Sequence, residues 1–427
     1  MKPPDNRVLM LLENQAYPQD HRVRREALAL ARAGYRVSVV CPATRAQVRH
    51  EVVDGVRVYR FRSPAPANGF LGYLREYGYC TAMSFFFSLW IFWREGFDVV
   101  HVHNPPDTFA FIGAFFKLFG KRLVFDHHDL SPEMYRARFP NGSKIVYKAL
   151  VLFERLACRL ADHVIATNES YKEIEIERHN VPAERIIVVR NGVEVPRDRP
   201  MPPDSPDHGL RRKGKTIIAF LGVMGFQDGL DYLIRALRHL RYDLGRRDFY
   251  CVLMGGGDAL ASVTKLAREL DLEKHVWFPG LVQGDRLVCY LSAADICVDP
   301  DPGCEYNDRS TMIKMMEYMA YAKPIVAFDL REHRVTAESA AIYVKPNDEL
   351  AFARALAELM DDPAKRKAMG AFGRQRIETQ LAWHYSIPNL LAVYRKVLPK
   401  SVVAEPQAVP QRNPVRTATV GSRQAGV

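Results

Sequence analysis

The chain alternates short apolar strands with helices, and it does so in two successive blocks. In the front half the expected strands are Arg7–Leu12, Arg36–Cys41, Val56–Phe61, Asp98–His103, Arg122–Asp126 and His163–Thr167. In the back half they are Thr216–Leu221, Phe249–Met254, Val276–Phe278, Ile296–Val298, Pro324–Phe328 and Ala341–Val344. Because buried strands that alternate with helices form parallel sheets, the sequence predicts an α/β protein. We expect two Rossmann-like, doubly wound domains that face a cleft.

A proline-rich segment separates the two blocks. Residues 196–215 hold five prolines and show no apolar period, so they predict a linker. The two domains are then expected at 1–195 and 216–382, the second followed by a last helix over 383–398. From residue 399 to 427 the chain is polar and aperiodic, which predicts disorder.

The positive charge of the chain is unevenly distributed. The net charge is +11, and residues 1–195 carry 27 Lys and Arg against 21 Asp and Glu. Residues 216–399 are close to neutral, with 23 against 24. A basic front half predicts an anionic partner. Since no basic helix with interleaved aromatic residues and no nucleic-acid module occurs, we expect an anionic membrane surface or a phosphorylated acceptor, and no nucleic acid.

The cysteines indicate the compartment. Seven cysteines without a C-x-x-C pair argue for buried thiols under reducing conditions, and against a zinc site or a disulfide framework. The first residues lead into a strand and lack the pattern of a signal peptide. We therefore expect a cytoplasmic protein, at the inner face of the plasma membrane if its anionic partner is a membrane.

The segment Asn307–Ala320 has the pattern of an anion site on a helix. Ser310 and Thr311 are good N-cap residues, and the first N–H groups of a helix are unpaired. Lys314 follows one turn in, and Glu317 falls on the same face. A cation near those N–H groups suits a pyrophosphate, and a carboxylate one turn deeper suits the hydroxyls of a ribose. An ordinary amphipathic helix with a solvated Lys and Glu explains the spacing equally well.

Seven motifs along the chain carry a family resemblance. Those of the back half are FLGVMGFQDGLDYLI (220–234), LMGGGD (253–258), VWFPGLV (276–282), AADICVDP (293–300) and KMMEYMAYAKPIVA (314–327). Those of the front half are DVVHVHNPPD (98–107) and LVFDHHDL (123–130). With these motifs in this order, the chain resembles the retaining GT-B glycosyltransferases of bacterial family 4 over roughly residues 7–398.

This resemblance implies an activity. Such enzymes transfer a sugar from a nucleotide sugar, often a UDP-sugar, to lipid-linked or polysaccharide acceptors in cell-surface glycan assembly. The nucleotide sugar is a co-substrate, so no cofactor and no metal are expected. The resemblance also implies that the helix over 383–398 crosses back to the first domain.

The resemblance further implies roles for individual residues. His128 would hold the transferred sugar, and Asp129 would orient the imidazole or meet the acceptor, whereas a capped turn with a structural histidine is the alternative. His103 and Asn104 are assigned to substrate binding. The donor site is assigned to Gly225, Gln227, Gly256, Arg309, Ser310, Thr311, Lys314 and Glu317. A metal site in D-H-H-D is disfavoured because neighbouring residues of one short run cannot converge on one ion.

The chain departs from the family pattern at the donor site. The family commonly has two glutamates eight residues apart, but Arg309 stands eight residues before Glu317. Gln227 and Asp228 stand where a phosphate-binding lysine is expected. We interpret these changes as a relocation of positive charge to Arg309 and Lys314. A catalytically dead protein is the alternative.

The loop after the first strand, ENQAYPQDHRVRRE (13–26), replaces the Gly-Gly that the family often has there. Asp20 could orient an acceptor hydroxyl and is counted with the catalytic candidates. Arg22 could face a donor or acceptor phosphate. A plain N-cap followed by a solvated helix face explains both residues equally well.

The segment Cys80–Trp93 holds 14 residues without a charge, which is too short to span a bilayer unaided. We expect a core helix packed on the front sheet. A surface that dips into the membrane beside the acceptor site is the alternative, and Tyr73, Arg75, Tyr77 and Tyr79 upstream would support it.

Three other function classes compete. A nucleotide-sugar 2-epimerase would share the two-domain architecture but need no acceptor. An inactive sugar- or nucleotide-binding protein would keep the cleft. An NAD-dependent dehydrogenase would need G-x-G-x-x-G directly after the first strand, where Leu12, Glu13 and Asn14 stand instead.

Overall fold

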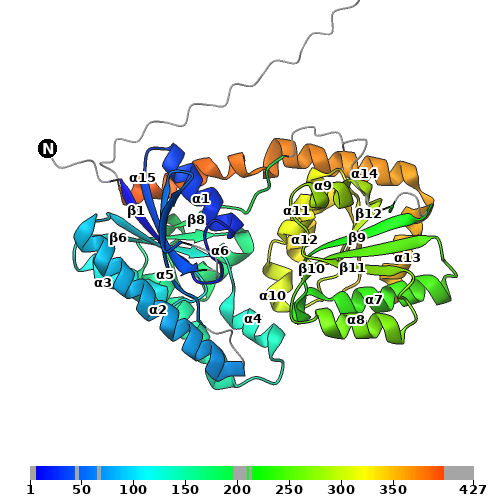
Figure 1. Cartoon of the computed structure of the whole chain (residues 1–427), viewed down its shortest axis with the longest axis horizontal. Coiled ribbons are helices and arrows are strands. Elements are labelled where there is room, and N and C mark those ends of the chain that lie inside the picture. The colour runs from blue at the N-terminus through cyan, green and yellow to red at the C-terminus, as the bar shows by residue number, and fades with distance from the viewer. Residues whose placement is uncertain (1–5, 44–47, 65–68, 196–208, 211–213, 399–427) are drawn as a thin grey trace, which may run out of the picture.

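A computed structural model of the chain describes residues 6–43, 48–64, 69–195, 209–210 and 214–398. Two α/β domains lie side by side, the first at the left and the second at the right of Figure 1. All of the expected disordered tail (399–427) and most of the expected linker (196–215) lie outside the described residues.

The first domain is built on an eight-stranded sheet of order β3-β4-β2-β1-β5-β6-β7-β8. Every neighbouring pair is parallel except β3–β4, which is antiparallel. The strands are β1 Arg7–Leu11, β2 Arg36–Ala43, β3 His50–Val53, β4 Val56–Arg62, β5 Val99–His103, β6 Arg122–His127, β7 His163–Ala166 and β8 Ile186–Val188. The helices are α1 His21–Arg32, α2 Gly69–Arg94, α3 Phe109–Lys117, α4 Ser131–Arg138, α5 Lys144–Leu160 and α6 Glu169–Glu177.

The second domain is built on a six-stranded parallel sheet of order β11-β10-β9-β12-β13-β14. Its strands are β9 Thr216–Val223, β10 Phe249–Gly256, β11 Val276–Gly280, β12 Ile296–Asp299, β13 Ile325–Phe328 and β14 Ala341–Val344. Its helices are α7 Leu230–Arg238, α8 Leu260–Glu269, α9 Asp285–Ala293, α10 Glu305–Arg309, α11 Ile313–Ala320, α12 Arg331–Ala337, α13 Glu349–Asp361 and α14 Pro363–Arg376. The predicted doubly wound α/β class is therefore confirmed.

Helices cover each sheet on both faces, and a hydrophobic core lies on each face. In the first domain one core lies under α2, α3 and α5, and the other lies under α1 and the C-terminal helix α15, Ile387–Val397. In the second domain one core lies under α7, α8 and α13, and the other lies under α9 and α11. In both sheets the chain first adds strands on one side of the first strand and then adds the later strands on its other side. Ligands of such sheets bind at this reversal, outside the carboxyl ends of the strands, here β1 with β5 and β9 with β12.

The chain returns to the first domain at its C-terminal end. Helices α14 and α15 run along the top of Figure 1, and α15 packs on the first sheet through Leu390 and Tyr394. The hydroxyl of Tyr394 lies 2.8 Å from Nδ1 of the buried His101 on β5. A helix over roughly 383–398 that reaches the first domain was expected. The structure adds that Trp383–Tyr385 form a short 3-10 turn before it.

Three local features differ from the sequence prediction. Strands β3 and β8 were not predicted, because runs of four and three residues give too short a pattern. The polar loop expected to open the helix with Lys314 is partly a short helix, α10, and residues 310–312 separate it from α11. Helix α2 is not a fully buried core helix, since one side of it is exposed. Within the described part of the chain, no helix is both long and apolar enough to cross a membrane.

Candidate active site

The His128 loop is held in place by one buried amide side chain. The Oδ1 atom of Asn104, after β5, accepts hydrogen bonds from the backbone N–H groups of His128 (2.9 Å) and Asp129 (3.1 Å). Its Nδ2 donates to the carbonyl of Asp129 (2.7 Å) and to the carboxylate of Asp107 (3.1 Å). Asn104 is buried, and both ends of its amide are occupied. It therefore positions the loop, and no group of it remains for the substrate contact that we predicted.

His128 lies beside a carboxylate that our sequence reading did not single out. Its Nδ1 is 3.5 Å from Oδ2 of Asp126, the penultimate residue of β6. Burial lowers the pKa of His128, but the carboxylates of Asp126 and, to a smaller degree, Asp129 together raise it above the ordinary value. Asp126 thus stabilises a protonated imidazole at the carboxyl end of the sheet. The sequence did not indicate this role of Asp126. Asp126 lies within strand β6, whereas His128 lies in the loop after it.

Asp126 is itself fixed by Arg22 of α1. Nε and Nη2 of Arg22 donate to the two carboxylate oxygens of Asp126, both at 2.7 Å. The same guanidinium donates to Asn191 and to the carbonyl of Val189. Arg22 is buried, and these contacts use its N–H groups inside the domain. The prediction that Arg22 faces a phosphate is corrected accordingly, and Arg22 anchors the carboxylate next to His128.

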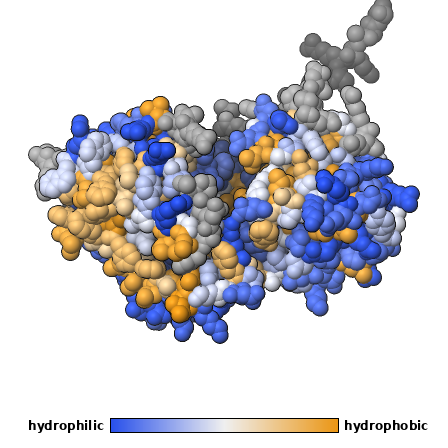
Figure 2. Space-filling view, turned by 60° about the horizontal axis from the view of Figure 1, so that its bottom comes forward, coloured by the Kyte–Doolittle hydropathy of each residue, from blue (hydrophilic) through white to orange (hydrophobic). Residues whose placement is uncertain are grey.

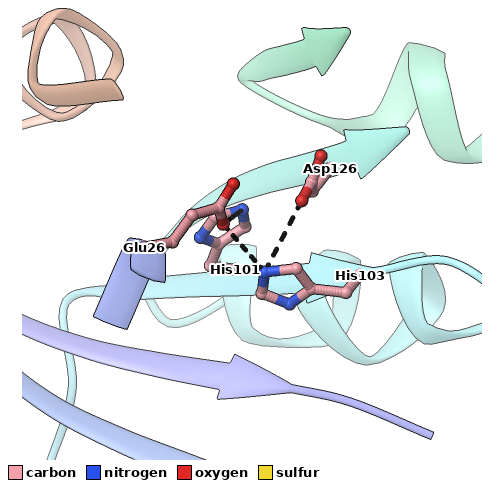
Figure 3. Close-up of side chains that lie close together, drawn as sticks. All are labelled: Glu26, His101, His103 and Asp126. Carbon is pink, nitrogen blue, oxygen red and sulfur yellow. Dashed lines mark hydrogen bonds and ion pairs between the residues drawn. The ribbon is translucent and has the colours of Figure 1, made fainter. Parts of the chain in front are cut away.

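A buried polar cluster extends behind this pair. Glu26, His101, His103 and Asp126 point toward one another between α1, β5 and β6 (Figure 3). His103 lies 3.1 Å from Glu26 through Nε2 and 3.2 Å from the Leu11 carbonyl through Nδ1. The nitrogen and carboxylate oxygen atoms of the four clustered residues lie within 4.8 Å of one another, a spacing that could hold a metal ion. The Arg22 guanidinium supplies a positive charge at this place, so we interpret the cluster as an ion network. His103 belongs to this network. Its side chain is buried and does not reach the cleft, contrary to the predicted substrate contact.

Asp129 and Asp20 lie on the cleft side of the same sheet. Burial raises the pKa of Asp129, and the hydroxyl of Tyr306 on α10 lies 3.5 Å from its Oδ1, across the domain boundary. Asp20 caps α1, because its side chain accepts a hydrogen bond from the N–H of Val23 (2.8 Å). The capping interpretation of Asp20 is thus confirmed, and a contact to an acceptor hydroxyl stays a prediction.

Glu13 is a further buried carboxyl at this edge, directly beyond β1. Burial raises its pKa to about 7, and the thiol of Cys80 on α2 lies 3.7 Å from its Oε1. A carboxyl that titrates near neutrality at the end of a first strand is a candidate for acceptor contact or proton transfer. The sequence motif carried no signal for it, because its raised pKa depends on the packing of α2.

The glycine motifs of the second domain bring two strand ends into close contact. A Cβ on Gly255 would lie 1.8 Å from the carbonyl oxygen of Gly222, so only glycine fits between β9 and β10. Gly225 donates its N–H to Asp228 (2.9 Å), and the Gln227 carbonyl accepts a hydrogen bond from Asn307 (3.0 Å). Gly225 and Gln227 therefore lie in a tight turn after β9, and the neighbouring Gly256 ends β10. Their contact with the donor stays a prediction.

Lys314 is not the free cation that the sequence suggested. Its Nζ lies 2.6 Å from Asp301, 3.1 Å from Asp299 and 4.0 Å from Asp228. Burial lowers the pKa of Lys314, but these carboxylates together raise it above the ordinary value. The ammonium group of Lys314 therefore balances these buried carboxylates. Its contact with a donor phosphate stays a prediction.

Asp299 and Asp301 also form a group with His333 whose ligand atoms lie within 4.8 Å of one another, a second spacing that could hold a metal ion. Lys314 already pairs with both carboxylates. We therefore interpret this group, like the first, as an ion network.

Ser310 and Thr311 do not cap a helix that binds an anion. The N-cap of α11 is Met312, and it makes no side-chain cap bond. Ser310 lies 3.0 Å from the hydroxyl of Tyr171 on α6, and Thr311 accepts a hydrogen bond from Asn168 (3.0 Å). Both residues therefore join the second domain to the first. The capping rule failed because these tertiary contacts determine where α11 begins.

Arg309 lies at the same domain boundary. Its carbonyl accepts a hydrogen bond from Asn168 (2.9 Å). Arg331 lowers the pKa of Glu173 on α6, and the charge of Arg309 adds a smaller effect in the same direction. Arg309 is thus oriented toward α6. Its contact with the donor diphosphate stays a prediction.

Glu317 lines a cavity between the two domains. The cavity has a volume of about 940 Å³ and lies between α1 on one side and α9 and α11 on the other. Burial raises the pKa of Glu317, and the charge of Arg25 across the cavity lowers it. The α1 wall carries His21, Arg24, Arg25 and Arg32. A carboxylate facing a row of cations across a cavity of this size suits a ribose next to phosphates.

Two family models match the chain, one in each half. The family model described as "Glycosyl transferase 4-like domain" matches residues 19–192, and "Glycosyl transferases group 1" matches residues 215–362. A D-inositol 3-phosphate glycosyltransferase of Salinispora tropica is 28% identical over 291 residues, which cover 64% of this chain and 59% of that relative. The chain thus spans about three fifths of the length of that relative. An uncharacterized glycosyltransferase of Methanocaldococcus jannaschii is 25% identical over 390 residues, 86% of this chain and 92% of that protein.

Solved structures share the fold. Sucrose-phosphate synthase from Thermosynechococcus elongatus matches with a TM-score of 0.74 at 19% identity, over 93% of this chain and all of that chain. The Anabaena HepE protein in complex with UDP-glucose matches with a TM-score of 0.68 at 17% identity, over 91% of this chain and 99% of that chain. At these identities the likeness concerns the arrangement of the two domains.

Proposed function

Because this chain belongs to the family 4 glycosyltransferases, which have the GT-B fold and use nucleotide sugars with retention of configuration, we propose a specific reaction for it. The protein transfers a hexosyl or acetylhexosaminyl group from a UDP-sugar to a lipid-linked or polysaccharide acceptor, in the assembly of a cell-surface glycan. The reaction takes place in the cytoplasm, for which the seven free cysteines, six of them buried, provide support.

The observation that carries this proposal is the cavity between α1 and α11, in which Glu317 faces Arg25. A nucleoside diphosphate has two neighbouring hydroxyls on the ribose and two anionic phosphates. Glu317 accepts hydrogen bonds from the hydroxyls, and Arg25 with Arg24 meets the phosphates. The HepE complex contains UDP-glucose, which supports UDP as the first nucleotide to test.

The chemistry then takes place at the His128 loop. The acceptor oxygen forms a bond to the anomeric carbon, and the bond between that carbon and the diphosphate oxygen breaks. The electron pair goes to the leaving diphosphate, which also takes the proton of the acceptor hydroxyl. The side chain of His128, held protonated by Asp126, holds the transferred sugar beside the leaving diphosphate, on which the negative charge develops. Asp129 and Asp20 orient the acceptor.

Thermal shift with UDP, GDP, ADP and dTDP tests the donor site. A ligand that binds only the folded protein raises the melting temperature according to its occupancy. We expect UDP to give the largest shift, and Glu317→Ala to reduce it. The control is Glu358→Ala on α13, which removes a carboxylate that pairs with Lys365 and does not line the cavity.

Product analysis separates the alternatives. We expect UDP-sugar and a membrane fraction as acceptor source to give a glycosylated product, with and without EDTA. Interconversion of nucleotide sugars without an acceptor would identify a 2-epimerase instead. Nucleotide binding without any turnover would identify an inactive binding protein, and a shift of equal size in the Glu317→Ala variant would remove Glu317 from the site.

A further inference from the structure

Helix α2 has an apolar side that no other element of the described chain covers. Its inner side is buried at Cys80, Ser84, Ser88 and Ile91. Its exposed residues follow at helical spacing, and they are Leu71, Leu74, Arg75, Gly78, Ala82, Phe86, Trp90, Trp93 and Arg94. Phe86 is 63% and Trp93 79% exposed. A soluble helix is expected to expose polar residues on this side, whereas a helix that is apolar all round is covered by protein or by lipid.

The apolar surface continues onto two neighbouring helices. Phe85 of α2 contacts Phe115 of α3, with ring centroids 5.1 Å apart, and Phe111 of α3 contacts Phe153 of α5 at 6.1 Å. Beyond these contacts, Leu118 just after α3 is 81% exposed and Ile145 of α5 is 80% exposed. Figure 2 shows the apolar side chains gathered on the first domain, over the side where Figure 1 has α2 and α3. We call this surface the α2–α3–α5 face.

The charges on these three helices are almost all positive. They hold seven Lys and Arg, of which Lys117 and Arg155 are half-buried and donate to backbone carbonyls. The exposed five are Arg75, Arg94, Lys144, Lys148 and Arg159. The two acidic residues of these helices are Glu76 and Glu154, and Glu154 is buried against His127 and His179. An exposed face with aromatic and aliphatic side chains and a cationic surround matches the interface of an anionic bilayer.

We propose that the α2–α3–α5 face docks on an anionic lipid bilayer, with α2 lying along the membrane surface and Phe86, Trp90 and Trp93 inserted between the lipid headgroups. A helix of this length that carries Trp at one end and arginines at both ends suits the interface plane. A second copy of the chain fits less well, because a twofold contact would bring the cations of both copies together.

The geometry connects this face to the cleft. The inner side of α2 reaches Glu13 through Cys80, at the carboxyl end of β1. The bilayer-facing helix therefore borders the end of the sheet at which the His128 loop lies. An acceptor anchored in the membrane would meet the cleft along α2, although docking on lipid does not itself depend on the proposed transfer reaction.

Vesicle sedimentation with the full chain tests the proposal. The vesicles are phosphatidylcholine alone, or phosphatidylcholine mixed with phosphatidylglycerol, without donor or acceptor. We expect sedimentation with the anionic vesicles and a loss of about tenfold or more in partitioning for the double variant Phe86→Glu/Trp93→Glu, since two large apolar side chains leave the lipid. The matched control is Val335→Glu on α12 of the second domain, which adds an acidic group at a 43% exposed apolar position.

Each outcome of the vesicle experiment either supports or overturns the proposal. Circular dichroism and the UDP thermal shift confirm that each variant is folded, and Phe86→Ser/Trp93→Ser replaces the acidic pair if that pair fails to fold. No sedimentation of the wild-type chain with anionic vesicles would overturn the proposal. An equal loss in Val335→Glu would also overturn it, because the effect would then be one of net charge. A dimer in solution that Phe86→Glu/Trp93→Glu converts to a monomer would assign the face to a second copy instead.

Discussion

The carboxylate of Asp126 lies between two cations, with Arg22 bound to both of its oxygens at 2.7 Å and Nδ1 of His128 at 3.5 Å. The two cations lower the pKa of Asp126 well below its ordinary value, although burial alone would raise it. Arg22 fixes the carboxylate from α1, and the carboxylate in turn orients the imidazole. The end of β6 is thereby connected to α1 through one buried anion.

We predict that His128→Ala lowers the rate of sugar transfer by about a hundredfold or more and leaves UDP affinity nearly unchanged. The reason is that loss of one contact made in the transition state lowers kcat rather than ligand binding. Steady-state kinetics with a UDP-sugar and calorimetry with UDP measure the two effects. A variant that transfers sugar at the wild-type rate would remove His128 from the catalytic site.

We predict that Asp126→Asn acts through His128. Without the carboxylate the imidazole loses its orienting partner, and transfer falls by up to about a hundredfold. Because Asp126 raises the pKa of His128 and the protonated imidazole is the active form, the basic limb of the pH–rate profile that reports His128 moves to lower pH in the variant. The pH dependence of kcat in both proteins measures this displacement.

The control for Asp126→Asn is Asp98→Asn. Asp98 is also buried and pairs with an arginine, Arg7, at 3.3 Å, but it lies before the amino end of β5, remote from the cleft. Both substitutions should destabilise the first domain, and only Asp126→Asn should displace the pH profile. The same displacement in both variants would mean that a general loss of stability, and not the contact to His128, causes it.

Lys314→Met should destabilise the second domain by about 3–5 kcal/mol, because Asp299 and Asp301 then remain buried without their cation. Protonation of the two carboxyl groups removes their negative charge and so reduces this loss of stability. Their pKa values rise in the variant, so the free energy lost should be smaller at pH 5 than at pH 8. Urea unfolding at both pH values measures the difference.

Lys323→Met is the matched control for this substitution. Lys323 donates to the carbonyls of Ser292 and Ala294, at 2.8 and 2.7 Å. Neither carbonyl titrates, so the loss of these two hydrogen bonds should cost the same free energy of unfolding at pH 5 and pH 8. If Lys314→Met behaves in the same way, Lys314 does not balance the aspartates. If it abolishes UDP binding in a fully stable protein, Lys314 contacts the phosphates after all.

The fold followed from the sequence because the relevant signals are local. Runs such as Ile325–Phe328 are apolar on both faces, and only a parallel sheet covered on both sides buries them. The loop with His128 was found for the same reason, since it directly follows a recognisable strand. The roles of Asp126 and Arg22 could not be found in this way, because 104 residues separate them in the sequence.

At Ser310, Thr311 and Lys314 the structure differs from the donor-site prediction, because local and tertiary signals compete there. Ser310 and Thr311 match the capping pattern, but Tyr171 and Asn168 of the other domain bind their hydroxyl groups. Lys314 and Glu317 do share a helix, yet only Glu317 lines the cavity, whereas Lys314 is buried among carboxylates. Their spacing along one helix predicted that Lys314 and Glu317 share a face. Because β12 packs against α11, Lys314 lies in a buried environment and Glu317 lies at the cavity.

Glu13→Gln should change the pH dependence of stability in a defined direction. Burial raises the pKa of Glu13 from 4.5 to about 7, so the folded protein holds this proton more firmly than the unfolded chain does. The contribution of Glu13 to stability is therefore fully present below pH 4.5 and is lost as the pH rises through about 7. Glutamine cannot ionise and avoids this loss. Relative to the wild type, the variant should gain up to about 3 kcal/mol between pH 4.5 and pH 8.

Chemical unfolding of both proteins across this pH range measures that gain, and the difference between them isolates Glu13 from other titrating groups. Asp107, whose pKa burial also raises to about 7, provides a second test in the same window. Asp107→Asn should show the same sign, and the two gains should add if the sites are independent. A stability difference between wild type and Glu13→Gln that stays constant from pH 4.5 to 8 would contradict the raised pKa. Glu13 would then not be available as a proton-binding group beside the acceptor at neutral pH.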